Sequence, residues 1–126
     1  MKTLLFISDK DENFNESFIE NVINGFLKQY FEIYCVYFGD KIYKNNNKII
    51  LLKSQRSRAL KVINDNFLSL KSVDFLIVRN FLDILKSAVK IKKIYKFKLF
   101  FQLSFPHFYR SYNEAKITKK MLFLNL

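Results

Sequence analysis

The sequence has little cysteine, glycine or proline and no tryptophan: one Cys, two Gly and one Pro among 126 residues. The single cysteine, Cys35, has no second thiol for an internal disulfide and cannot build a zinc site by itself. It lies in an apolar run, so we interpret it as a small buried residue. The scarcity of Gly and Pro argues against a β-sandwich with many tight turns and against a low-complexity chain.

Long hydrophobic runs are also missing. No apolar stretch approaches the roughly 20 residues that a membrane-spanning helix needs. The stretch Met1–Asp9 has too short an apolar core for a signal peptide and no small-residue cleavage site. We therefore expect a cytoplasmic protein. Peripheral binding to an anionic surface at the inner face of the membrane remains one of its candidate interactions.

Acidic residues are few, since 22 Lys and Arg outnumber 11 Asp and Glu and give a formal net charge of +11. Such a balance favours nucleic acid, an anionic membrane surface or phosphorylated ligands as partners. Lysines gather between Lys86 and Lys98 and again between Lys116 and Lys120. These stretches could follow nucleic acid or rest on anionic lipid, but a solvated face of a Lys-rich chain explains them equally well.

Half of the residues are hydrophobic, and the length suits one domain with one core. Short apolar runs alternate with segments whose apolar residues recur every three or four positions, which is typical of strands alternating with helices. The expected strands are 3–8, 31–38, 48–53, 73–78 and 97–103. The expected helices are 15–30 with Asn15 as N-cap, 55–70 with Ser54 as N-cap, 81–93, and 109–126. Residues 43–47 read as a polar turn.

This order of elements predicts a single α/β domain over residues 1–126, a three-layer Rossmann-like fold with a mostly parallel sheet. The expected strand order is 3-2-1-4-5. The order reverses between the first and fourth strands, where open α/β sheets place their ligands. The loop 8–15 should therefore face Arg79 and Asn80 across a crevice.

The loop 8–15 contains no glycine, so a dinucleotide-binding fingerprint and a P-loop are both absent. Its acids Asp9, Asp11 and Glu12 would repel a phosphate. Two interpretations remain open, a contact with a sugar or other hydroxyl-bearing ligand and a solvated connection.

Polar residues also follow the later strands. Arg79 can pair with a carboxylate or a phosphate, while Asn80 can cap the helix that begins at Phe81. His107, the only histidine, can act as an acid–base group or hydrogen-bond a sugar, although a lone surface histidine is more common. No nucleophile–base set and no metal-ligand cluster can be assembled, so we expect no cofactor and no metal.

Four segments carry a resemblance to a known family: Lys2–Ser8, Phe18–Leu27, Val73–Leu82 and Phe97–His107. Their sequences are KTLLFIS, FIENVINGFL, VDFLIVRNFL and FKLFFQLSFPH. Together they resemble the N-terminal half of group 1 glycosyltransferases with the GT-B fold. The resemblance covers almost the whole chain as a pattern of elements, but the Gly-rich first loop of many members is missing here.

The resemblance implies a domain that binds the sugar acceptor, while a second, C-terminal domain holds the nucleotide-sugar donor with a pair of glutamates seven residues apart. The sequence up to Leu126 contains no such domain, so we expect a chain that is inactive alone and lacks its donor-binding partner. The complete hexosyltransferase would move a sugar from a nucleotide sugar to a glycan or lipid-linked acceptor in surface polysaccharide synthesis. The alternative is a non-catalytic α/β module for an anionic partner such as nucleic acid, which we rate lower.

Taken with the strand ends, the resemblance implies an acceptor site and one catalytic candidate, His107. The expected acceptor-binding residues are Ser8, Asp9, Asn13, Asn15, Arg79, Asn80, Ser104, His107, Tyr109 and Arg110.

Overall fold

The computed structural model describes residues 1–11 and 18–103. Six strands are present: β1 (Lys2–Ile7), β2 (Phe31–Gly39), β3 (Tyr43–Asn45), β4 (Lys48–Leu52), β5 (Phe75–Arg79) and β6 (Lys98–Gln102). Two α-helices are present, α1 (Ala59–Asn66) and α2 (Leu82–Tyr95), with a π-helix η1 (Phe18–Phe26). Three short 3₁₀ helices complete this set: η2 (Leu27–Gln29), η3 (Lys53–Arg58) and η4 (Leu70–Ser72).

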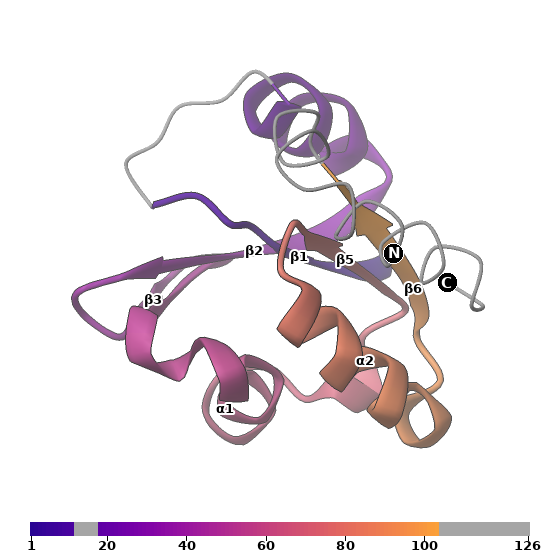
Figure 1. The fold of residues 1–126 in the computed structure, drawn as a ribbon. Coiled ribbons are helices and arrows are strands. Elements are labelled where there is room, and N and C mark those ends of the chain that lie inside the picture. Colours follow the sequence, from indigo (N-terminus) through magenta and orange to yellow (C-terminus); the bar gives the residue numbers. More distant parts are fainter. Residues whose placement is uncertain (12–17, 104–126) are drawn as a thin grey trace.

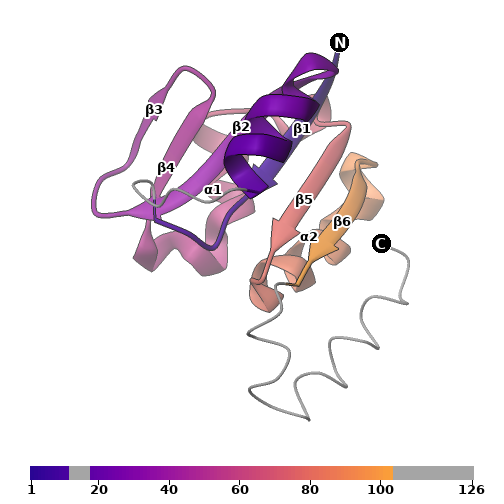
Figure 2. The same ribbon diagram turned by 90° about the horizontal axis from the view of Figure 1, so that it is seen from above.

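All the strands belong to one sheet of order β3-β4-β2-β1-β5-β6 (Figure 2). The five strands β4, β2, β1, β5 and β6 run parallel, which confirms the mostly parallel α/β fold and the order of these five strands. The sheet differs from the prediction at one edge, where β3 pairs antiparallel with β4. We had predicted a polar turn there. All three β3 residues are exposed, so this strand carries no apolar signal in the sequence.

Helices cover the two faces of the sheet unequally, with α1 and α2 on one face and η1 on the other (Figure 1). Alternate residues of the central strand β1 supply both cores. Leu5 and Ile7 pack on the α1–α2 side, while Leu4 and Phe6 pack with Ile23 of η1. Because both of their faces are buried, β1, β2 and β4 read as near-continuous apolar runs, and this is why the sequence located them.

The first helix is where the expected periodicity fails. We predicted one apolar stripe on an α-helix from Asn15 to Tyr30, but the structure has the π-helix η1 followed by η2. Ile23 is buried and Leu27 is half-buried, whereas Phe26 and Tyr30 are each 58% exposed. A π-helix has wider turns, with hydrogen bonds from i to i+5, so residues spaced for an α-helix do not stay on one face. The N-cap Asn15 lies outside the described residues.

The second predicted helix, 55–70, is broken into pieces. A 3₁₀ turn, η3, precedes α1, and α1 ends at Asn66, after the polar run Asn64–Asn66. Ser54 is not the N-cap, because it lies inside η3. Gln55 instead accepts a hydrogen bond through Oε1 from the backbone N–H of Leu52 at 3.0 Å. Within the described residues, the other predicted elements lie within about two residues of their predicted bounds.

Cys35 is buried in β2, as predicted. Burial raises the pKa of its thiol from an ordinary value of 9.0 to about 11. The thiolate is the reactive form, so we expect iodoacetamide at about pH 8 to modify the folded protein far more slowly than the guanidinium-unfolded chain. Equal rates of iodoacetamide modification before and after unfolding would contradict the burial of Cys35.

The folded state holds the thiol proton more tightly than the unfolded chain does. Cys35 therefore contributes stability that is complete below pH 9.0 and is lost as pH rises to about 11.

Candidate functional site

The chain turns sharply where β1 ends, at the carboxyl edge of the sheet. Ser8 is fully buried, and its N–H donates to the carbonyl of Val36 at 2.9 Å, which continues the pairing with β2. Its Oγ accepts a hydrogen bond from the N–H of Lys10 at 3.0 Å. This local hydrogen bond fixes the first residues of the loop, and Asp9 between them is held against the end of β5.

Asp9 is bound by two side chains from the end of β5. The amide Nδ2 of Asn80 donates to Asp9 Oδ2 at 2.7 Å, and Arg79 Nε lies 3.6 Å from Asp9 Oδ1. The Arg79 and Asp9 side chains are only 6% and 9% exposed. The structure therefore places Asp9 next to Arg79 and Asn80 at the predicted switch point, in direct contact with them and not across a crevice. The partner of Arg79 is a carboxylate of its own chain, so these two buried charges balance each other.

Asn80 is not the N-cap residue of the following helix, so the helix boundary expected at Phe81 was wrong by one residue. Helix α2 begins at Leu82, and its N-cap Phe81 makes no side-chain cap bond. Asn80 has a φ of 62°, and the N–H of Phe81 donates to the carbonyl of Arg79 at 2.8 Å. The N–H of Asn80 also donates to the carbonyl of Gln102 at 2.9 Å. This three-residue turn places Asn80 Nδ2 within hydrogen-bond distance of Asp9.

A pocket of about 380 Å³ opens beside this network. It is lined by Asp9, Lys10, Asp11, Phe38, Lys53, Arg56 and Phe81. The rings of Phe38 and Phe81 pack edge to face, with their centroids 5.4 Å apart, and form an apolar wall. The guanidinium carbon Cζ of Arg56 lies 5.0 Å from the centroid of the Phe81 ring, and its Nε lies 3.0 Å from Asp83 Oδ2. Charged groups of both signs surround the apolar wall, which suits a ligand with polar substituents on a compact body.

Gln102 adds a further polar group at this edge. It stands opposite Arg79 in the register between β5 and β6. Its Oε1 is buried and has no hydrogen-bond partner within residues 1–11 and 18–103. The carboxyl edge thus holds a hydrogen-bond acceptor beyond the Asp9 carboxylate.

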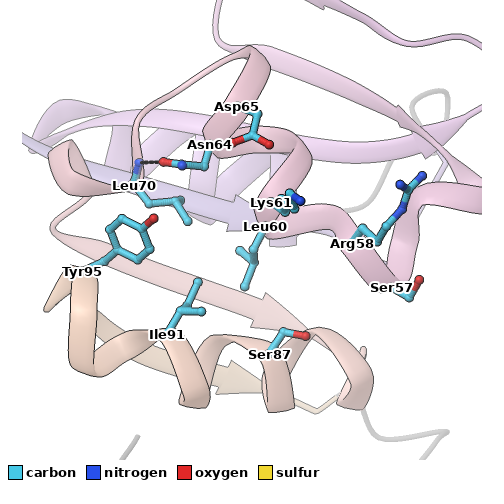
Figure 3. A pocket seen from close by; sticks show the side chains of 10 residues that line it. All are labelled: Ser57, Arg58, Leu60, Lys61, Asn64, Asp65, Leu70, Ser87, Ile91 and Tyr95. Carbon is cyan, nitrogen blue, oxygen red and sulfur yellow. Dashed lines mark hydrogen bonds between the residues drawn. The ribbon is translucent and has the colours of Figure 1, made fainter.

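A second hollow, of about 390 Å³, lies between α1 and α2 (Figure 3). Leu60, Leu70 and Ile91 line it together with the ring of Tyr95. Asn64 is engaged, because its Oδ1 accepts a hydrogen bond from the N–H of Leu70 at 2.9 Å. This hollow lies on the face of the sheet that α1 and α2 cover, away from the switch point of the sheet. It gathers no buried charges, so we place the candidate site at the carboxyl edge.

Of the predicted acceptor-site residues, Ser8, Asp9, Arg79 and Asn80 lie together at this edge. The others lie outside the described residues: Asn13, Asn15, Ser104, His107, Tyr109 and Arg110. The expected helix 109–126 also falls there. Sequence reasoning missed Phe38, Lys53, Arg56 and Phe81 as pocket residues. The strand-end rule, extended to the second and third predicted strands, would have found Phe38 and Lys53.

Comparison of the chain with protein-family models, curated proteins and solved structures found no match. The fold itself defines the class, an α/β domain with a Rossmann-like three-layer arrangement. Within the part of the chain that the structure describes, no helix has the length and apolarity to cross a membrane. The same residues hold no group of three or more His, Cys, Asp or Glu placed to bind a metal ion.

Proposed function

We propose that this chain is the acceptor-side domain of a glycosyltransferase and binds a sugar in the pocket beside Asp9. The observation that carries the proposal is the position of this pocket. It lies at the carboxyl edge of a parallel sheet, next to the switch point between β1 and β5. Open α/β sheets bind their ligands at this place. The resemblance of the sequence to the N-terminal half of GT-B glycosyltransferases gives the chemical class.

The groups around the pocket support a sugar as the ligand. Asp11 can accept hydrogen bonds from hydroxyl groups, and Lys53 can donate them. The wall of Phe38 and Phe81 offers an apolar surface to the carbon skeleton of a ring. The buried pair of Asp9 and Arg79 needs no ligand charge for balance, which suits a neutral ligand.

A titration of the ¹⁵N-labelled full chain with glucose, galactose and N-acetylglucosamine tests the proposal. We expect saturable shifts in the amide resonances of Asp9–Asp11, Lys53–Arg56 and Phe81, with millimolar dissociation constants. Asp11→Asn should weaken binding by about five-fold, because it replaces a charged acceptor by a neutral one at a hydroxyl-binding position. We expect this loss for at least one of the three sugars.

The matched control is Asp65→Asn, which makes the same change at the hollow between α1 and α2. It should leave sugar binding unchanged. The proposal fails if none of the sugars shifts these resonances. It also fails if both variants bind as the parent does, since the site would then lie elsewhere.

The alternative, a non-catalytic module for an anionic partner, is favoured by the net charge of +11. It predicts binding to single-stranded nucleic acid that weakens steeply with salt, because counterions are released on binding. Nucleic-acid binding without any sugar response would select this alternative.

A further inference from the structure

We propose that the outward face of α2 binds an anionic membrane surface. Lys86, Lys90 and Lys93 are spaced by four and three residues, so they share one side of the helix. All three are exposed, while Ile84, Leu85 and Ala88 on the other side are buried against the sheet. The basic stripe therefore faces away from the sheet, and α2 itself lies on the outside of one face of the sheet (Figure 1).

Apolar side chains flank this stripe. Val89 is 39% exposed and Ile94 is 70% exposed. At 100° per residue, Val89 lies beside Lys93 and Ile94 lies beside Lys90, on opposite margins of the stripe. A solvated helix face has no need of an isoleucine exposed to this extent beside its lysines. The apolar face of α2 is packed against the sheet, so what this stripe offers a membrane is attraction of its lysines to anionic headgroups, with Val89 and Ile94 beside them to contact the acyl boundary.

The charged residues of α2 itself are mostly basic. Asp83, the acidic residue of the helix, is paired with Arg56 at 3.0 Å. Lys96, which ends the helix in a left-handed conformation, is exposed and adds a cation beyond the stripe. Lipid headgroups accept the lysines, and the hydrocarbon boundary accepts Ile94. A phosphate backbone would use the lysines alone, so the isoleucine distinguishes lipid from nucleic acid as the partner.

Flotation of the full chain with vesicles tests this surface. We expect binding to phosphatidylcholine vesicles that contain phosphatidylglycerol, no binding to pure phosphatidylcholine, and weaker binding at high salt. Each lysine near an anionic surface contributes about a five-fold change in affinity, so Lys86→Gln/Lys90→Gln/Lys93→Gln should bind about a hundred-fold more weakly. The arginine version of this triple variant should still bind.

Two matched controls separate this face from general charge and general apolarity. Lys28→Gln/Lys41→Gln/Lys71→Gln removes the same charge from exposed positions elsewhere and should bind far better than the α2 variant. Ile94→Ser should weaken binding by several-fold, while Ile42→Ser, at a 43% exposed position before β3, should not. Circular dichroism confirms that each variant is folded.

Three outcomes would overturn the proposal. The first is an equal loss in both triple variants, and the second is an Ile94→Ser variant that binds like Ile42→Ser. The third is binding of single-stranded nucleic acid through the α2 lysines without vesicle binding. Sugar titrations of the α2 variants should match those of the parent. The membrane-binding proposal can therefore fail without the sugar-binding proposal failing, and the reverse.

Discussion

Replacing Arg79 by methionine should destabilise the protein by about 3–5 kcal/mol, because it leaves the Asp9 carboxylate buried without its cation. For a domain of this size, the midpoint of thermal unfolding should fall by roughly 10–20 °C. Thermal melts followed by circular dichroism measure the shift. Asp9→Asn/Arg79→Met should recover more than half of the loss. This double variant removes both charges but keeps an oxygen that can accept from the Asn80 amide.

The matched control is Arg56→Met, the same substitution in an ion pair at the surface. Arg56 and Asp83 lie 3.0 Å apart, closer than Arg79 and Asp9, but their side chains are 52% and 40% exposed. Exposed pairs contribute about 0–1 kcal/mol, so this variant should melt near the parent temperature. If Arg79→Met costs no more than Arg56→Met, burial does not decide the strength of the Asp9–Arg79 pair.

Phe6→Ala should cost about 3–5 kcal/mol in the free energy of unfolding. Phe6 is fully buried in the central strand, in the core that Ile23 of η1 covers. Its removal leaves a cavity between the sheet and the π-helix, which other side chains cannot fill without moving. Urea unfolding of the variant measures the loss.

The control is Phe100→Ala on β6, at the far edge of the same face. Phe100 pairs in register with Ile77 of β5, and its ring lies 6.4 Å from that of Phe75. It is 48% exposed, so its removal should cost about 1 kcal/mol or less. A cost close to that of Phe6→Ala would show that another element covers the β5–β6 part of this face in solution.

The parallel strands could be predicted because each carries a run of apolar residues. In β1, β2 and β4 this run reflects burial on both faces, and β6 carries a similar run although Lys98 and Phe100 are exposed. The edge strand β3 could not, since Tyr43, Lys44 and Asn45 are all exposed and it is defined only by pairing with β4. The sequence failed to predict the π-helix η1 for a different reason. Residues 18–30 carry α-helical spacing, and no local pattern signals the wider turn that exposes Phe26 and Tyr30.

The candidate site was predictable in position but not in its internal contacts. Strand order placed the loop after β1 against Arg79 and Asn80. The choice of Asp9 as their partner depends on the turn at Asn80, whose positive φ no sequence rule required. Asparagine tolerates this conformation better than most residues, but it is equally common at helix N-caps. Sequence alone therefore favoured the cap.

The central position of β1 has a consequence for the chain as it leaves the ribosome. β1 is made before both of its neighbours, β2 and β5, and β5 follows only after β3, β4 and α1. Until β5 is made, the apolar run Leu4–Ile7 has at least one unpaired edge, which is the kind of surface that associates with other chains. The arrival of β5 closes this edge and delivers Arg79 to Asp9 in the same step. The ion pair thus forms only when β1 has gained its second neighbour.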